Sequence, residues 1–96
     1  MPGGQGVLQD ESEAVKWFQK AAAQGNPHAE YQLGTIYYAG EMAKKDYPTA
    51  FKWLSLAAAQ GFKDSAQMLE KLKSDMTSAE ITEGQRLLRE FKPSKT

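Results

Sequence analysis

The single histidine of this chain is the residue that could serve as a catalytic base or a metal ligand, depending on the side chains near it. His28 is the only histidine among 96 residues, and Glu30 lies two positions beyond it. A metal site would need further ligands three or four positions away, where Tyr31 and Gln32 are poor ligands. We therefore expect His28 to act neither as a catalytic base nor as a metal ligand, and we expect no cofactor.

Other patterns of catalytic or nucleotide-binding residues are missing from the sequence. The chain has no cysteine, which excludes a disulfide framework, a thiolate zinc site and a cysteine nucleophile. It has no Ser-x-x-Lys motif, and its glycine-rich string at 3–6 lacks the Gly-Lys-Ser/Thr of a phosphate-binding loop. Glu80 and Glu83 share a helix face with Arg86, which favours surface ion pairing over acid–base chemistry. The sequence thus predicts no catalytic residue and no enzyme.

The charge balance and the hydropathy pattern exclude two further classes of partner. Twelve basic residues balance twelve acidic ones, whereas a general nucleic-acid binder would be basic. No run of 18 apolar residues occurs, so we expect no membrane insertion. Residues 1–6 lack the basic and apolar regions of a signal peptide. A cytoplasmic protein and a mature exported fragment both stay open.

An internal repeat of 36 residues organises the chain. Shifting the sequence by 36 places residues 14–25 on residues 50–61, with eight of twelve positions identical. Asp10 then falls on Asp46, and Leu33 falls on Leu69. A unit of this length suits two helices and two turns, which is the building block of an α-solenoid. We therefore predict an all-α solenoid of about five helices.

Helix-capping residues mark where the first four helices begin and end. The capping residues predicted at the starts are Asp10 with Glu13, Asn26 followed by Pro27, and Asp46 with Pro48 in the first turn. Gly25, Gly40 and Gly61 are expected to end the first three helices. A fourth helix is predicted over residues 64–73, with Ser65, Met68, Leu69 and Leu72 facing inward.

The last helix and the overall division of the chain follow from the same reasoning. Thr77 and Glu80 form a second capping box, and the helix must end before Pro93. We expect an N-terminal loop over 1–9, a repeat region over 10–73 with one whole repeat at about 26–61, a capping helix over 76–92, and a frayed tail over 93–96.

Small and large apolar residues are expected to interlock between the helices. Gly34 lies in mid-helix, where it costs about 1 kcal/mol relative to alanine, so it needs a reason such as a close helix approach. Facing it we expect the alanines of the repeat, namely Ala21, Ala22, Ala57 and Ala58. Trp17 and Trp53 would supply one large apolar anchor in each repeat.

These residues are similar to the Sel-1-like repeat family, a relative of the tetratricopeptide repeats. The positions that match the family pattern are Ala29, Leu33, Gly34, Tyr37, Gly40, Asp46, Ala50, Trp53, Ala57, Ala58, Gln60 and Gly61. A partial upstream copy matches at Gly4, Gly6, Val7, Asp10, Ala14, Trp17, Ala21, Ala22, Gln24 and Gly25. Met42 and Ala43 depart from the family, which has Gly-Val there. The resemblance covers about residues 4–73, and the segment 76–91 resembles the capping helix that often ends such arrays.

The resemblance implies a non-catalytic scaffold or adaptor that binds a protein or peptide in a concave groove. By analogy with tetratricopeptide domains, the first helix of each repeat lines that groove. His28, Tyr31, Thr35 and Tyr38 would then face the partner, and tyrosine suits recognition surfaces because it combines a large area with a polar tip. The alternative is that one or both tyrosines pack against neighbouring repeats.

Two other functions are compatible with the same sequence. An open N-terminal helix face around Val15 and Phe18 could pair between chains, which would make the protein a self-assembling module or homo-oligomer. Cysteine-rich members of the family have been linked to β-lactam binding or hydrolysis. A β-lactam-binding or hydrolysing enzyme is the remote alternative, because this chain has neither cysteine nor a serine–lysine motif.

Overall fold

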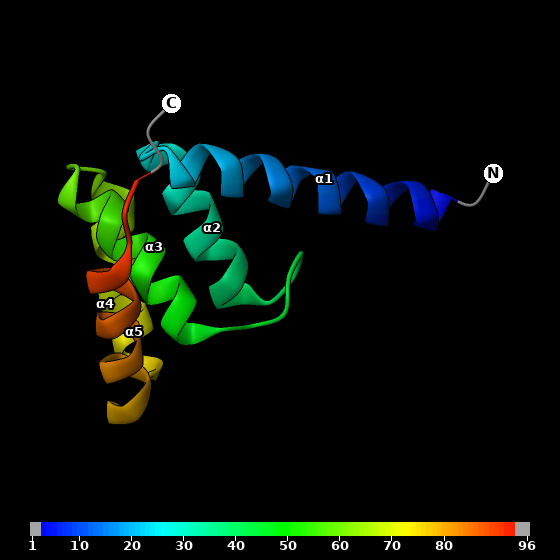
Figure 1. Ribbon diagram of the computed structural model, residues 1–96. Coiled ribbons are helices and arrows are strands. Elements are labelled where there is room, and N and C mark those ends of the chain that lie inside the picture. Colours follow the sequence, from blue (N-terminus) through cyan, green and yellow to red (C-terminus); the bar gives the residue numbers. More distant parts are fainter. Residues whose placement is uncertain (1–2, 94–96) are drawn as a thin grey trace.

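Five α-helices make up the part of the chain that the structure describes. The computed structural model describes the backbone of residues 3–93 and the side chains of residues 12–93. The helices are α1 (Gly3–Ala23), α2 (Pro27–Ala39), α3 (Tyr47–Ala59), α4 (Lys63–Asp75) and α5 (Ser78–Glu90), with no strand in the described range. The prediction of an all-α fold with five helices is confirmed. Figure 1 shows α1 reaching away from a stack that the other four helices form.

The starts of three helices lie where the capping residues predicted them. Asn26 Oδ1 accepts a hydrogen bond from the Ala29 amide at 3.0 Å, and Asp46 Oδ1 accepts one from the Thr49 amide at 3.1 Å. Thr77 and Glu80 form the reciprocal capping box, with bonds of 2.9 and 3.1 Å. Each bond satisfies a backbone N–H group that a helix start leaves without an intrahelical partner.

The repeat is visible in the geometry of the helix ends. Gly25 and Gly61, which are 36 positions apart, both have positive φ, at 90° and 89°. After α1, the Gly25 amide donates to Ala22 O at 2.9 Å and the Asn26 amide to Ala21 O at 3.1 Å. After α3, Gly61 and Phe62 make the equivalent bonds at 2.9 and 3.1 Å. The two turns therefore close their helices with the same Schellman motif.

The N-terminal loop that we expected over residues 1–9 is wrong for residues 3–9, and residues 1–2 lie outside the described range. Helix α1 begins at Gly3 and continues through Asp10, which therefore does not start the helix. The physical reason is that no proline lies between residues 3 and 23. Glycines at 3, 4 and 6 lower helix propensity without removing a backbone hydrogen bond. Of the expected frayed tail, Pro93 is exposed and residues 94–96 lie outside the described range.

The hydrophobic core follows the two central helices, α2 and α3. One cluster joins α1, α2 and α3 and is built on Val15, Ala22, Ala29, Leu33, Ile36 and Trp53. The other joins α3 to α4 and is built on Ala50, Phe51, Leu54 and Leu72. Tyr37 packs against both clusters, so a single core runs through the stack.

Two glycines set the close approach of helices on either side of α3. A Cβ on Gly34 would overlap Leu54 Cγ and Cδ2 and would lie 3.3 Å from the Leu54 backbone nitrogen. A Cβ on Gly84 of α5 would lie 2.7 Å from Phe51 Cδ1. The expected close approach at Gly34 is therefore present. Its nearest partner is Leu54, not the alanines that we predicted, because α2 meets α3 about one turn before Ala57 and Ala58.

The capping helix lies on α3 and completes the burial of one tryptophan. The Trp53 and Phe91 rings meet edge to face with centroids 5.5 Å apart. Trp53 is 8% exposed, as expected of an anchor, whereas Trp17 is 66% exposed. The prediction that both tryptophans anchor the core is wrong for Trp17, because no described side chain covers it as Phe91 covers Trp53.

We predict that Gly34→Ala destabilises the fold although alanine is the better helix former. Overpacking of a filled core costs about 1–3 kcal/mol, whereas the gain in helix propensity is only about 1 kcal/mol. Leu54 is fully buried and cannot move aside freely. The free energy of unfolding, measured by urea titration, should fall by about 1–2 kcal/mol. Gln67→Ala, an exposed substitution on α4, is the control and should change little.

Candidate interaction surfaces

The four residues predicted to line a groove share one side of α2. His28 is exposed, and Tyr31, Thr35 and Tyr38 are half-buried. The Tyr31 ring packs on Phe62 with centroids 5.0 Å apart, and His28 meets the same ring edge-on at 6.0 Å. Phe62 is the residue directly before α4. The structure thus gathers an aromatic patch of His28, Tyr31 and Phe62 between the starts of α2 and α4.

Tyr38 and Thr35 use their hydroxyl groups within the chain. The Tyr38 hydroxyl donates to Asp75 Oδ2 at 2.5 Å, and its ring meets Tyr47 edge-on at 5.6 Å. The bond to the carboxylate raises the pKa of Tyr38 to about 12, because it stabilises the protonated phenol. Thr35 Oγ1 donates to Gln32 O at 2.8 Å. These two contacts tie α2 to the end of α4 and to its own preceding turn, which leaves the aromatic patch as the more open part of this surface.

The outer face of α1 carries an exposed tryptophan where the sequence predicted other residues. Val15 is 8% exposed and Phe18 is half-buried, because both lie on the side of α1 that packs on α2. The expectation that these two residues form an open apolar edge is therefore wrong. Trp17 lies on the opposite side, with the Lys20 ammonium 5.6 Å from its ring centroid. It lines a shallow hollow of about 170 Å³ with Glu13, Lys16 and Lys20.

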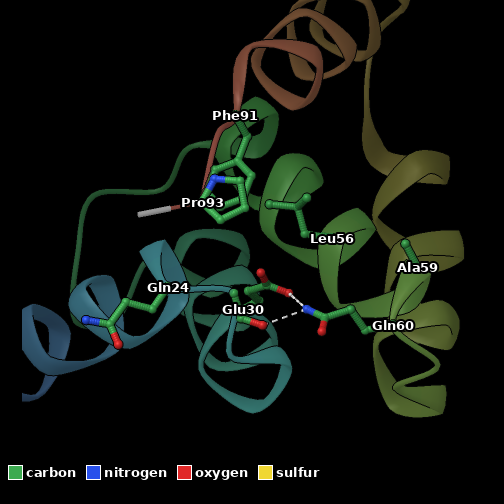
Figure 2. Close-up of a pocket in the computed structure, with 8 residues that line it drawn as sticks. Gln24, Glu30, Leu56, Ala59, Gln60, Phe91 and Pro93 are labelled. Carbon is green, nitrogen blue, oxygen red and sulfur yellow. Dashed lines mark hydrogen bonds between the residues drawn. The ribbon is translucent and has the colours of Figure 1, made fainter. Parts of the chain in front are cut away.

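A larger pocket of about 510 Å³ lies where the α1–α2 turn meets α3 and the C-terminal segment. Figure 2 shows its lining, which consists of Gln24, Gly25, Glu30, Leu56, Ala59, Gln60, Phe91 and Pro93. The aliphatic and aromatic members come from α3 and from the segment directly after α5, and the polar members come from α2 and the two glycine turns. The pocket therefore has apolar walls and a few polar groups, as small ligand sites commonly do.

Glu30 is the buried charged group of this pocket. It is 1% exposed, and its Oε1 accepts a hydrogen bond from Gln60 Nε2 at 2.9 Å. The same Gln60 nitrogen donates to Gly25 O at 2.8 Å, which joins α3 to the turn before α2. Burial raises the pKa of the Glu30 carboxyl, and the bond from Gln60 partly opposes that rise. No Lys, Arg or His nitrogen among the described residues lies within 4.0 Å of the Glu30 carboxylate.

Sequence reasoning missed Glu30, which it treated only as a neighbour of His28. One feature could have indicated burial: Glu30 precedes Leu33 by three positions and Tyr37 by seven, so it shares a helix face with both. His28 and Glu30 are two positions apart and therefore project from opposite sides of α2. The aromatic patch and the pocket are thus separate surfaces of one helix.

The described residues also bear on metal binding and on membrane insertion. These residues contain no group of three or more His, Cys, Asp or Glu side chains that could hold a metal ion. In the same part of the chain, no helix combines the length and the apolar character needed to cross a bilayer.

We predict that Glu30→Gln gains stability relative to the native chain as the pH rises. A carboxyl whose pKa is raised in the folded state favours folding most when it is protonated, and this advantage is lost as the pH rises through the folded-state pKa. Glutamine can keep the bond from Gln60 without carrying the charge. Thermal unfolding followed by circular dichroism should show Glu30→Gln above the native chain at about pH 7, with the difference smaller at about pH 4. An equal or lower midpoint for the variant at neutral pH would contradict this.

Comparison with known proteins agrees with the architecture. A family model described as the Sel1 repeat matches residues 3–26 and 27–62, which together make up more than half of the chain. The boundary between the two matches falls at the Gly25–Asn26 turn, where the structure begins its second helix. Comparisons with curated proteins and with solved structures find no match. The length matched and the repeated helix-end geometry establish that this chain belongs to the Sel1 repeat family.

Proposed function

We propose that this chain is a non-catalytic scaffold or adaptor that binds a protein or peptide on the concave side of its repeats. Sel1 repeats are generally protein–protein interaction modules and typically not enzymes. The observation that carries the proposal here is the aromatic patch of His28, Tyr31 and Phe62. Aromatic side chains that keep an exposed edge and a polar tip are common at the centres of binding surfaces.

The support beneath the patch is rigid, which favours binding without a large change of shape. Asn26 caps α2 two residues before His28, and Gly34 lets α2 pack closely on Leu54. Tyr31 also packs against the buried cluster of α3 and α4. A preformed surface loses less conformational entropy on binding than a mobile one, so the patch can use most of its contact area for affinity.

The test substitutes residues of the patch and compares the effect on binding with that of a substitution at Tyr38, whose hydroxyl is bonded to Asp75. Partners captured on the immobilised chain are identified, and their affinity is measured by calorimetry for each variant. His28→Ala combined with Tyr31→Ala should weaken binding about tenfold or more, because residues at interface centres contribute over 1 kcal/mol each. Tyr38→Phe, which removes only the hydroxyl bonded to Asp75, is the matched control and should bind nearly as well.

Circular dichroism separates loss of contact from loss of structure. If the double variant loses helicity or unfolds at a much lower temperature, Tyr31 acts as a core residue. If it keeps its helicity and binds as tightly as the native chain, the aromatic patch is not the binding surface.

A second function, self-assembly, is favoured by one specific observation, the exposure of Trp17. Its repeat equivalent, Trp53, is covered by Phe91 and by the Lys52 ammonium, which lies 4.2 Å from the Trp53 ring centroid. A large exposed aromatic ring is a common centre for association between chains. On this reading Trp17, with Lys16 and Lys20 beside it, would be the contact between two copies.

Light scattering after gel filtration tests this second function over a roughly hundredfold range of concentration, since mass action governs association. If α1 pairs two chains, the mass should rise with concentration, and Trp17→Ala should remove the rise. Met42→Ala is the control, because Met42 is the other exposed large apolar side chain among those described. A constant monomer mass would reject self-assembly and leave the scaffold function unaffected.

A further inference from the structure

We propose that the pocket around Glu30 binds an arginine side chain of a partner protein. This inference rests on the proposed scaffold function and adds a second contact to it, on the opposite side of α2 from the aromatic patch. The pocket measures about 510 Å³, and Glu30, Gln60, Leu56 and Phe91 contribute to its lining. Figure 2 shows Glu30 and Gln60 joined side by side beneath Leu56 and the C-terminal residues.

The need for a positive charge comes from the Glu30 carboxylate. This side chain is 1% exposed, and within the described structure it receives one side-chain hydrogen bond, from the neutral Gln60 amide to Oε1. Its second oxygen, Oε2, accepts none from the residues described, and it keeps some contact with solvent, because no fully buried side-chain oxygen in this part of the chain lacks a partner. A buried carboxylate that lacks a cation is costly, and a cation brought to it gains more attraction than it would in water. A partner that supplies the cation relieves this cost.

The lining favours an organic cation over a metal ion. Calcium and magnesium require several oxygen ligands around one point, and Glu30 is the only carboxylate among the described residues that line the pocket. Leu56, Ala59 and Pro93 present apolar surface instead. Such walls suit the aliphatic part of a long basic side chain, which can pack against them while its charged end reaches the carboxylate.

Two features favour arginine over lysine. The Gln60 amide nitrogen donates to Glu30 Oε1 and to Gly25 O, which leaves Glu30 Oε2 without a donor from the described residues. A planar guanidinium can donate to both oxygens of one carboxylate at once, whereas an ammonium acts as a point charge. Phe91 adds an aromatic ring in the lining, on which a guanidinium can stack.

Lys52, the basic residue of α3, does not neutralise the Glu30 carboxylate. The Lys52 ammonium lies over Trp53 at 4.2 Å and 5.7 Å from the Phe91 ring centroid. It is not paired with Glu30. The Phe91 ring, at the end of α5, therefore already lies near one positive charge. Lys52 does not occupy the Glu30 carboxylate, which an incoming side chain can reach.

The experiment is a titration of the isotope-labelled chain with N-acetyl-arginine amide, followed by two-dimensional NMR. Saturable shifts are expected at the Gly25 amide, the Gln60 side-chain amide and the backbone of Ala59. N-acetyl-citrulline amide, which has the same shape without the charge, should bind about tenfold more weakly or worse, since bonds to charged groups contribute about 1.5–3 kcal/mol. Absence of saturable shifts, or equal affinity for citrulline, would overturn the proposal.

Two variants test the pocket in different ways. Glu30→Gln keeps the acceptor for Gln60 and removes the charge, and it should abolish the preference for arginine. Ala59→Leu fills the pocket from an exposed position at the end of α3 and should abolish binding with Glu30 intact. Glu70→Gln and Ala66→Leu, exposed positions on α4, are the matched controls and should bind like the native chain. If Glu30→Gln fails to fold, Ala59→Leu decides the result.

Further arms separate the sources of the cation. Free arginine should bind no more tightly than the blocked form, and tighter binding would indicate a metabolite pocket and overturn the assignment to a protein side chain. Lys95 is two residues beyond Pro93 and outside the described range, so Lys95→Gln is titrated as well. It should bind the probe at least as tightly as the native chain, and weaker binding would overturn the proposal.

The result is independent of the test of the aromatic patch. The probe reports on the pocket without any partner, so a negative titration with intact partner binding rejects only the arginine site. If the His28→Ala, Tyr31→Ala and Glu30→Gln variants all bind the partner as tightly as the native chain, both surfaces are rejected.

Discussion

The close approach of α2 and α3 at Gly34 is the constraint on which the rest of the structure depends. Only a residue without a Cβ lets the Leu54 side chain and backbone come this near, and Leu54 is fully buried as a result. On the other side of α3, Gly84 allows α5 to approach Phe51 in the same way. Helix α3 is therefore held between two glycine contacts. This packing sets the positions of the start of α2 and the end of α3, which contribute residues to the candidate surfaces.

The 36-residue period gives equivalent backbones but unequal surfaces. The turns at Gly25 and Gly61 close with the same bonds, whereas the side chains around them meet different neighbours. Glu70 stands at the repeat position of Gly34 and Lys73 at that of Tyr37, and the two form an exposed ion pair at 3.3 Å. The corresponding face of α4 is thus polar, whereas the outer face of α1 presents Trp17. The two ends of the stack therefore offer different surfaces to another protein, although their backbones follow the same repeat.

The two surfaces of α2 differ in the physics that each offers to a partner. The aromatic patch of His28, Tyr31 and Phe62 offers area and polar tips on rings that pack against one another. The pocket offers a buried carboxylate whose raised pKa records the cost of its desolvation. Contact area such as that of the aromatic patch supplies affinity. A buried charge such as the Glu30 carboxylate discriminates between partners, because it penalises any partner that lacks a cation.

The sequence by itself determined the number of helices, the caps of three of them and the family, because these depend on contacts within a few residues and on a repeated pattern, whereas it misplaced the start of α1. Asn26, Asp46, Thr77 and the glycines at 25, 40 and 61 act where local chemistry placed them. Only the tertiary structure decided which face of each helix is covered. Trp17 is exposed and Trp53 buried although their local sequences agree, and Glu30 is buried beside an exposed His28. The reason is that burial depends on neighbours brought from α3 and α5, far along the chain, and no local pattern encodes where those neighbours lie.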